Sequence, residues 1–185
     1  MPQRIVLLLN GTSSAGKTTV ARALQRTLKP RWLCFGVDQF IEMLTDAAPE
    51  SAPEPDGQDV GRWLAEGWYG VIGGIAASGF DLIVDDVIVE PHRLEAAIRL
   101  LAPLDVTFVA VRCPLEVAVQ RERERGDRHL GLVTHQFDLV HADRTYDCVI
   151  DTSTLDPEAC VAAIRPVVEG GGPRAFEVMR RRMDT

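Results

Sequence analysis

The chain has 185 residues, enough for one domain with a sizeable buried core and too few for two typical domains. Hydrophobic residues make up 46% of it and charged residues 25%, a composition that excludes global disorder. Its net charge of −7 argues against general affinity for nucleic acid or for an anionic membrane, because either would require a basic face, although local basic clusters could still bind phosphates.

The cysteines are far apart and form no Cys-x-x-Cys pair, which favours buried thiols in a reducing cytoplasm over a zinc site or a disulfide framework. They are Cys34, Cys113, Cys148 and Cys160. No signal-peptide pattern precedes the first apolar run, and no run approaches the roughly 20 residues that span a bilayer. We therefore expect a cytoplasmic protein.

Apolar runs bounded by turn residues alternate with segments of helical spacing. The runs lie at residues 4–9, 32–37, 80–88, 104–111 and 147–150, and the helical segments at 17–28, 59–77, 92–101, 114–124 and 157–168. This alternation is typical of a parallel sheet covered on both faces. We predict a three-layer α/β/α domain with a five-stranded parallel sheet over residues 1–168, followed by a basic tail over 169–185.

The first run leads into residues 11–18, whose sequence is Gly-Thr-Ser-Ser-Ala-Gly-Lys-Thr. It matches G-x-x-x-x-G-K-[ST], a loop between a strand and a helix whose backbone N–H groups surround phosphates. Its lysine reaches the outer phosphates, and its last hydroxyl, here that of Thr18, ligates Mg²⁺. The pattern predicts nucleotide contacts from Gly11, Thr12, Ser13, Ser14, Ala15, Gly16, Lys17, Thr18 and Thr19.

Asp38 follows the second run, at the sheet edge where the phosphate loop also lies. A carboxylate there can accept the proton of a substrate hydroxyl during phosphoryl transfer. It can also cap a helix over residues 39–46, and the two roles are compatible.

Residues 45–58 are rich in proline and acid and predict a long loop, either a substrate flap or a surface insertion. We expect the aromatic residues of the next predicted helix to lie in the core. They could instead line an apolar acceptor pocket, together with residues near the second and third strands. The residues concerned are Trp63, Trp68, Tyr69, Phe35, Phe40 and Val87.

Asp85 and Asp86 follow the third run. An acid in this position commonly holds Mg²⁺ or its water beside a phosphate loop, although a simple strand-end turn is the alternative. One of the pair would face the metal and the other could orient the substrate or Lys17, and the sequence leaves open which does which, because it does not fix the end of the strand. As a working assignment we take Asp85 for the metal and Asp86 for the acceptor side. The other acceptor-side candidates are Phe35, Val37 and Val87.

Residues 120–129 have the sequence Gln-Arg-Glu-Arg-Glu-Arg-Gly-Asp-Arg-His. Helical spacing places Arg121 and Arg125 on one face, and the glycine ends the helix. Arginines presented in this way can close over a nucleotide and neutralise the moving phosphoryl group. We expect Arg121 to bind nucleotide and Arg125 and Arg128 to act in catalysis. The interleaved glutamates favour a solvated, salt-bridged helix as the alternative, above all for Arg123.

The remaining polar residues give weaker indications. Residues 151–154 could line an adenine pocket or cap a helix, and the tail from Glu169 is either a hinge followed by a short basic helix or, in preference, a frayed terminus. The histidines have no metal-ligand spacing and are expected in loops or at the surface. They are His92, His129, His135 and His141.

These motifs resemble those of the chloramphenicol phosphotransferase family, small P-loop kinases related in fold to shikimate and adenylate kinases. The matching stretches are residues 9–18, 32–38, 83–87, 111–113, 125–128 and 146–152. The resemblance implies a P-loop kinase fold, ATP and Mg²⁺, the role of catalytic base for Asp38 and a lid role for Arg125 and Arg128. The sequence departs from the family at residues 45–62 and after Glu169, and the first departure leaves the acceptor open.

We therefore expect an ATP-dependent kinase that transfers the γ-phosphate to a hydroxyl of a small molecule, with chloramphenicol as one candidate acceptor. Asp38 would be the base, and Lys17 and the lid arginines would stabilise the transferring group. A metabolic or nucleotide-sugar kinase with another acceptor is the alternative. A nucleotide-dependent switch is less favoured, because the chain has no Asn-Lys-x-Asp stretch for guanine recognition. The residues leave the oligomeric state open.

Overall fold

The computed structural model describes the chain except for residues 1–4, 29–31, 46–59, 126–129, 171–173 and 184–185. The strands are β1 (Ile5–Asn10), β2 (Trp32–Gly36), β3 (Asp81–Asp86), β4 (Asp105–Arg112) and β5 (Cys148–Asp151). The helices are α1 (Lys17–Thr27), α2 (Val37–Thr45), α3 (Val60–Ala77), α4 (Pro91–Leu101), α5 (Leu115–Arg125), α6 (Leu132–Phe137), α7 (Pro157–Glu169) and α8 (Ala175–Met183).

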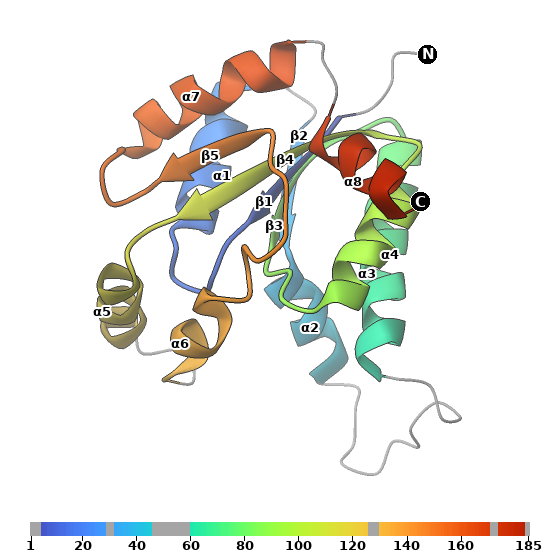
Figure 1. The fold of residues 1–185 in the computed structure, drawn as a ribbon. Coiled ribbons are helices and arrows are strands. Elements are labelled where there is room, and N and C mark those ends of the chain that lie inside the picture. Colours follow the sequence, from blue (N-terminus) through green and yellow to red (C-terminus); the bar gives the residue numbers. More distant parts are fainter. Residues whose placement is uncertain (1–4, 29–31, 46–59, 126–129, 171–173, 184–185) are drawn as a thin grey trace.

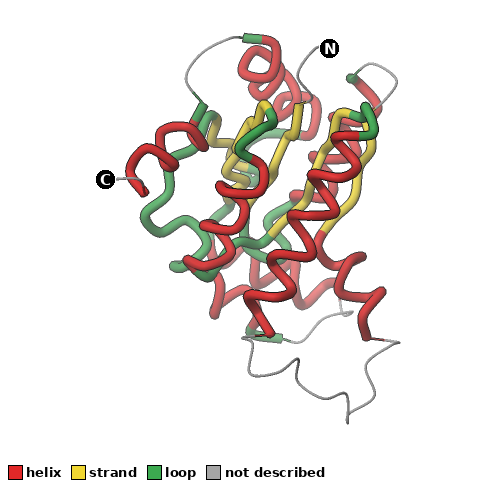
Figure 2. Tube along the Cα trace, turned by 90° about the vertical axis from the view of Figure 1, so that its right-hand side faces the viewer, coloured by secondary structure: helices red, strands yellow, loops and turns green. Residues whose placement is uncertain are grey.

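All strand pairings are parallel, and the strand order is β2-β3-β1-β4-β5 (Figure 1). Helices α1 and α7 lie on one face of the sheet, and α3, α4 and α8 on the other. Figure 2, turned so that the side of α3 and α4 faces the viewer, shows helices lying over the strands. The predicted three-layer α/β/α fold with a five-stranded parallel sheet is confirmed.

The alternation of side chains along the strands divides the core in two. Leu8 and Val84 pack with α3, α4 and α8, whereas Leu9 and Ile83, their neighbours in sequence, pack with α1 and α7. The inner positions of the central strands are therefore mostly apolar on both sides, because both faces of the sheet are covered.

The carboxyl ends of β1, β2 and β3 meet at one edge of the sheet. Asp85 is in register with Leu9 of β1 on one side and with Gly36 of β2 on the other. The loop after β1, the first turn of α2 and the end of β3 consequently lie side by side, where open parallel sheets bind ligands. Because α2 begins at Val37, Asp38 lies in its first turn and not ahead of it as a cap.

The interpretation of a frayed terminus is wrong for residues 174–183. Ala175, Phe176 and Met179 of α8 are buried in the core, and the ring of Phe176 packs edge-on against Phe108 of β4. Arg174 binds Asp105, with Nε 2.9 Å from Oδ1. An apolar stripe on the short basic helix thus completes the core on this face. None of the described helices is long and apolar enough to cross a membrane.

The prediction of buried thiols holds for two cysteines. Cys113 and Cys160 are buried, but Cys34 and Cys148 are half-buried, and all four are free. The difference follows from topology, because Cys34 lies on β2 and Cys148 on β5, the two edge strands of the sheet.

Candidate active site

The loop at residues 11–16 connects β1 to α1 through a tight turn. A Cβ atom on Gly11 would lie 2.3 Å from the Val111 carbonyl oxygen, so only glycine lets the loop pass this close to β4. Ser14 and Gly16 adopt left-handed backbone angles, with φ of 60° and 92°. The turn exposes the first N–H groups of α1, which have no intrahelical acceptors and form a site for anions.

Lys17, Thr18 and Asp85 lie together where this loop ends. Lys17 Nζ donates to the Thr12 carbonyl at 2.9 Å and lies 3.6 Å from Asp85 Oδ1. The Thr18 hydroxyl donates to Asp85 Oδ2 at 2.6 Å. Among the described residues, no group of three or more His, Cys, Asp or Glu side chains could hold a metal. The adjacent hydroxyl and carboxylate fit Mg²⁺, which commonly takes one or two protein oxygens and completes its shell with phosphates and water.

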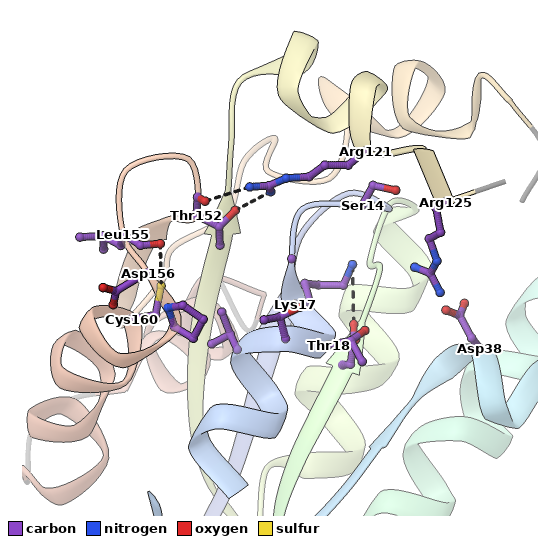
Figure 3. A pocket seen from close by; sticks show the side chains of 15 residues that line it. Ser14, Lys17, Thr18, Asp38, Arg121, Arg125, Thr152, Leu155, Asp156 and Cys160 are labelled. Atoms are coloured by element: carbon purple, nitrogen blue, oxygen red, sulfur yellow. Dashed lines mark hydrogen bonds and ion pairs between the residues drawn. The ribbon is translucent and has the colours of Figure 1, made fainter. Parts of the chain in front are cut away.

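A cleft of about 430 Å³ opens beside these residues (Figure 3). It is lined by Ser14, Gly16, Lys17, Thr18, Thr19, Val20, Asp38, Asp85, Arg121, Arg125, Thr152, Leu155, Asp156, Pro157 and Cys160. The cleft brings together predicted residues from five separate segments. Sequence reasoning missed Leu155 and the start of α7, although Asp156 is recognisable as a helix cap ahead of a proline and accepts from the Ala159 N–H at 2.8 Å.

Arg121 joins α5 to the segment after β5. Its guanidinium donates to the Thr152 hydroxyl at 2.9 Å and to the Thr152 carbonyl at 3.0 Å. The same hydroxyl donates to the Ala15 carbonyl of the phosphate loop at 2.7 Å. Thr152 therefore links α5 to the loop, while the Asp151 carboxylate accepts from the N–H and hydroxyl of Ser153 within its own turn.

Arg125 and Asp38 face each other across the opening of the cleft. Figure 3 shows the guanidinium of Arg125 and the carboxyl of Asp38 pointing toward one another. Both side chains are exposed and both line the cleft with Lys17. Arg128, predicted to share the role of Arg125, lies outside the described residues.

A buried contact fastens α5 to the phosphate loop through α6. Glu122 is 2% exposed, and its two carboxylate oxygens each accept a backbone N–H, from Gly131 and Val133, at 3.0 Å. Gln136 Oε1 then accepts the Ser13 N–H at 2.8 Å. The interpretation of a solvated helix is wrong for Glu122, because it shares the buried face of α5 with Ala118, whereas Arg123 is exposed.

The acceptor-side candidates lie outside this cleft. Asp86 is wholly buried, and four donors surround its carboxylate: Trp68 Nε1 at 2.9 Å, the Tyr69 hydroxyl at 2.8 Å, Arg93 at 3.0 Å and the Val87 N–H at 2.7 Å. Burial and the neighbouring Asp86 charge raise the pKa of Tyr69 well above its usual value, so its hydroxyl keeps the proton that it donates.

The aromatic residues near Asp86 divide between core and surface. Trp68, Tyr69 and Val37 are buried, Phe35 and Phe40 are half-buried against Trp68, and Trp63 is exposed. Val87 is half-buried at the end of β3.

His141 lies in a turn, as the prediction of a loop or surface histidine allows, but its side chain is half-buried. Its Nδ1 lies 2.9 Å from the Tyr146 hydroxyl, which also accepts from Asn10 Nδ2 at 2.8 Å. Burial, with the positive charges of Arg112 and Arg144, lowers the pKa of His141 from 6.5 to about 4. No local signal predicts this burial, because the Tyr146 hydroxyl beside His141 is itself bound by Asn10, which is distant in sequence at the base of the phosphate loop. His92 and His135 lie on helices, and His129 is outside the described residues.

Comparisons with known proteins give matches over most of the chain. A family model described as chloramphenicol phosphotransferase-like protein matches residues 4–169. A protein of Mycobacterium tuberculosis with the provisional name O-phosphotransferase is 32% identical over 206 aligned positions, covering 98% of this chain and 90% of the relative.

Solved structures share the fold. The Mycobacterium tuberculosis APS kinase CysC, solved with AMPPNP and APS, is similar with a TM-score of 0.64 and 14% identity over 92% of this chain and all of that one. Shikimate kinase from Aquifex aeolicus is similar with a TM-score of 0.57 and 19% identity, covering 90% of this chain and 99% of that one. The fold is that of P-loop kinases.

Proposed function

The chain belongs to the chloramphenicol phosphotransferase-like family, and from that membership we propose that it is a kinase that transfers the γ-phosphate of ATP to a hydroxyl of a small molecule. One observation carries the proposal: the phosphate-binding group Lys17, the exposed carboxylate Asp38 and the guanidinium of Arg125 all line a single cleft.

The donor side follows from the phosphate loop. The N–H groups at the start of α1 and the ammonium of Lys17 would hold the phosphates of ATP. Thr18 and Asp85 would hold Mg²⁺, which supplies charge neutralisation for the phosphates when it is bound. The adenosine would extend toward Arg121 and Thr152, in the part of the cleft that the start of α7 closes.

The chemical step is assigned to residues at the opening of the cleft. Asp38 accepts the proton of the acceptor hydroxyl while the oxygen of that hydroxyl forms a bond to the γ-phosphorus. The bond between the γ-phosphorus and the β,γ-bridging oxygen breaks, and ADP leaves. Lys17 and Arg125 stabilise the charge on the phosphoryl group in transit. We assign Arg128 the same role by its position in the sequence motif.

We propose that the acceptor side is partly apolar. Phe35 and Phe40 are half-buried and lie within three residues of Asp38, which supports an acceptor with an apolar or aromatic body and one reactive hydroxyl. Chloramphenicol has this chemistry, and we propose it as the first acceptor to test.

The test measures transfer of labelled γ-phosphate from ATP to a panel of hydroxylated acceptors that includes chloramphenicol, sugars and shikimate. Asp38→Asn should lower kcat by about a hundredfold or more with ATP affinity unchanged, because it removes the base and keeps the shape. Glu42→Gln, on the exposed face of the same helix one turn further on, is the control. ATP binding without transfer to any acceptor would refute the kinase, and full activity of Asp38→Asn would refute the base.

A further inference from the structure

The indole of Trp68 is fixed from one side by a buried charge. Its Nε1–H donates to Asp86 Oδ2 at 2.9 Å, and the same oxygen accepts from the Tyr69 hydroxyl. Arg93, 3.0 Å from the other carboxylate oxygen, balances the charge of Asp86. A hydrogen bond to a buried carboxylate is stronger than one between neutral groups, so it holds the ring of Trp68 in one orientation.

From the other side, the same indole contacts residues on both flanks of Asp38. Its ring centroid lies 5.5 Å from that of Phe35, three residues before Asp38, with the planes at 82°. It lies 5.4 Å from the centroid of Phe40, two residues after Asp38. A Cβ atom on Gly67 would lie 3.5 Å from Phe40 Cζ, so the Phe40 ring also reaches the backbone of α3.

The described side chains of helix α2 are mostly exposed. Of its side chains at positions 37–43, only Val37 is buried and only Phe40 is half-buried. The rest of this segment is exposed: Asp38, Gln39, Ile41, Glu42 and Met43. Among these described side chains, the contact of α2 with the core is therefore made by Val37 and by Phe40, which packs on Trp68.

We propose that Asp86 and Trp68 are positioning residues for the base, with Asp86 orienting the indole and the indole holding Phe35 and Phe40 so that Asp38 faces the cleft. The inference rests on the proposed function, in which Asp38 is the base. It gives Asp86 a role on the acceptor side that needs no contact with the acceptor. A displacement of about 1 Å at a reacting group can lower the rate about a hundredfold, so such support would be visible in kcat.

The test compares Trp68→Phe with Tyr69→Phe. Each variant removes one hydrogen bond to Asp86 Oδ2, but only Trp68→Phe changes the ring on which Phe35 and Phe40 rest. Two measurements are made on the full chain: backbone hydrogen exchange of residues 37–45, and kcat and KM for ATP with the acceptor that the wild-type protein phosphorylates fastest.

Trp68→Phe should accelerate exchange in α2 and lower kcat about tenfold or more, with KM for ATP within about twofold of wild type. Tyr69→Phe should leave α2 exchange and kcat near wild type. Equal kcat or equal α2 exchange in the two variants would overturn the inference and leave the proposed function intact. If the wild-type protein transfers no phosphate, the proposed function fails, and the exchange of α2 still decides whether Trp68 holds this helix.

Discussion

Asp85 and Asp86 are neighbours in the chain and face opposite layers of the molecule. Asp85 Oδ2 lies 2.6 Å from the Thr18 hydroxyl of α1, and Asp86 Oδ2 lies 2.9 Å from the Trp68 indole nitrogen of α3. Successive side chains of β3 point to opposite faces of the sheet, so Asp85 contacts the phosphate-loop side and Asp86 contacts Trp68, on which Phe40 of α2 packs.

Asp85→Asn should weaken the metal site. The amide keeps the shape but removes the charge beside Thr18 and Lys17, so the Mg²⁺ concentration for half-maximal rate should rise about tenfold or more. Asp81→Asn is the control, because Asp81 lies at the other end of β3 and accepts the Ile5 N–H. Magnesium titrations of the two variants measure the difference, and identical curves would argue against Asp85 as a ligand.

Asp86→Asn should destabilise the fold strongly, because it leaves Arg93 without its charge partner. Breaking a buried ion pair on one side costs about 3 to 5 kcal/mol, whereas Tyr69→Phe, which removes one hydrogen bond, should cost about 1 kcal/mol. Urea unfolding followed by circular dichroism measures both. Adding Arg93→Met to Asp86→Asn removes the second charge as well and should recover part of the lost stability. If the double variant is no more stable than Asp86→Asn, the broken ion pair is not the cause of the loss.

Gly11→Ala should disrupt the phosphate loop. Its methyl group would lie 2.3 Å from the Val111 carbonyl oxygen, so the loop or β4 must move, and we expect a loss of about 2 kcal/mol or more together with weaker ATP binding. Gly70→Ala is the matched control. It is an exposed helical position whose added Cβ meets nothing within 4 Å, and the change should stabilise the protein by about 0.5 to 1 kcal/mol.

Gln136→Ala should raise the dissociation constant for ATP. It removes the acceptor of the Ser13 N–H and the link between α6 and the phosphate loop, a loss of about 1 kcal/mol, or about fivefold in affinity. Calorimetric titration with a non-hydrolysable ATP analogue measures this. Gln120→Ala, whose side chain bonds only to Glu124 on the surface of α5, should bind as wild type. Equal affinity of the two variants would contradict the link.

His141 should make stability depend on pH. Its pKa in the folded protein is about 4, below its ordinary value of 6.5, so the unfolded chain binds more protons between these values. The free energy of unfolding should be highest above about pH 6.5 and fall by about 1 to 2 kcal/mol toward pH 4, after allowance for partial exposure. His141→Gln does not titrate and should flatten this dependence in urea unfolding. If the free energy of unfolding of His141→Gln depends on pH as strongly as that of the wild type, the dependence comes from other groups.

The elements that the sequence predicts well are those whose signals are local. Residues 11–18 specify a phosphate loop by residue types at fixed spacing. The five apolar runs predict a covered parallel sheet, and neither prediction requires information about distant residues. Asp38 and Asp85 could be placed at one site because parallel strands present their carboxyl ends at one edge.

The elements that the sequence predicts poorly depend on distant partners. Helix α6 has six residues and no cap in its own sequence, because Glu122 of α5 caps it from nine residues or more away. To predict which of Asp85 and Asp86 faces the phosphate loop, one must know the exact end of β3. An apolar run in the sequence leaves that end uncertain by about a residue or two. Helix α8 resembles a frayed end because a glycine-rich stretch precedes it, and its place is set by distant contacts such as those with Phe108 and Asp105 on β4.

The place of α8 in the core also bears on how the protein is made. The ribosome synthesises residues 174–183 after every other described element, yet Phe176 covers Phe108 on the central strand β4. Until those residues emerge, the nascent sheet presents an uncovered apolar patch to the cell. Chaperone demand during translation should therefore peak late, and a slow codon run ahead of α8 would prolong the exposure of that patch.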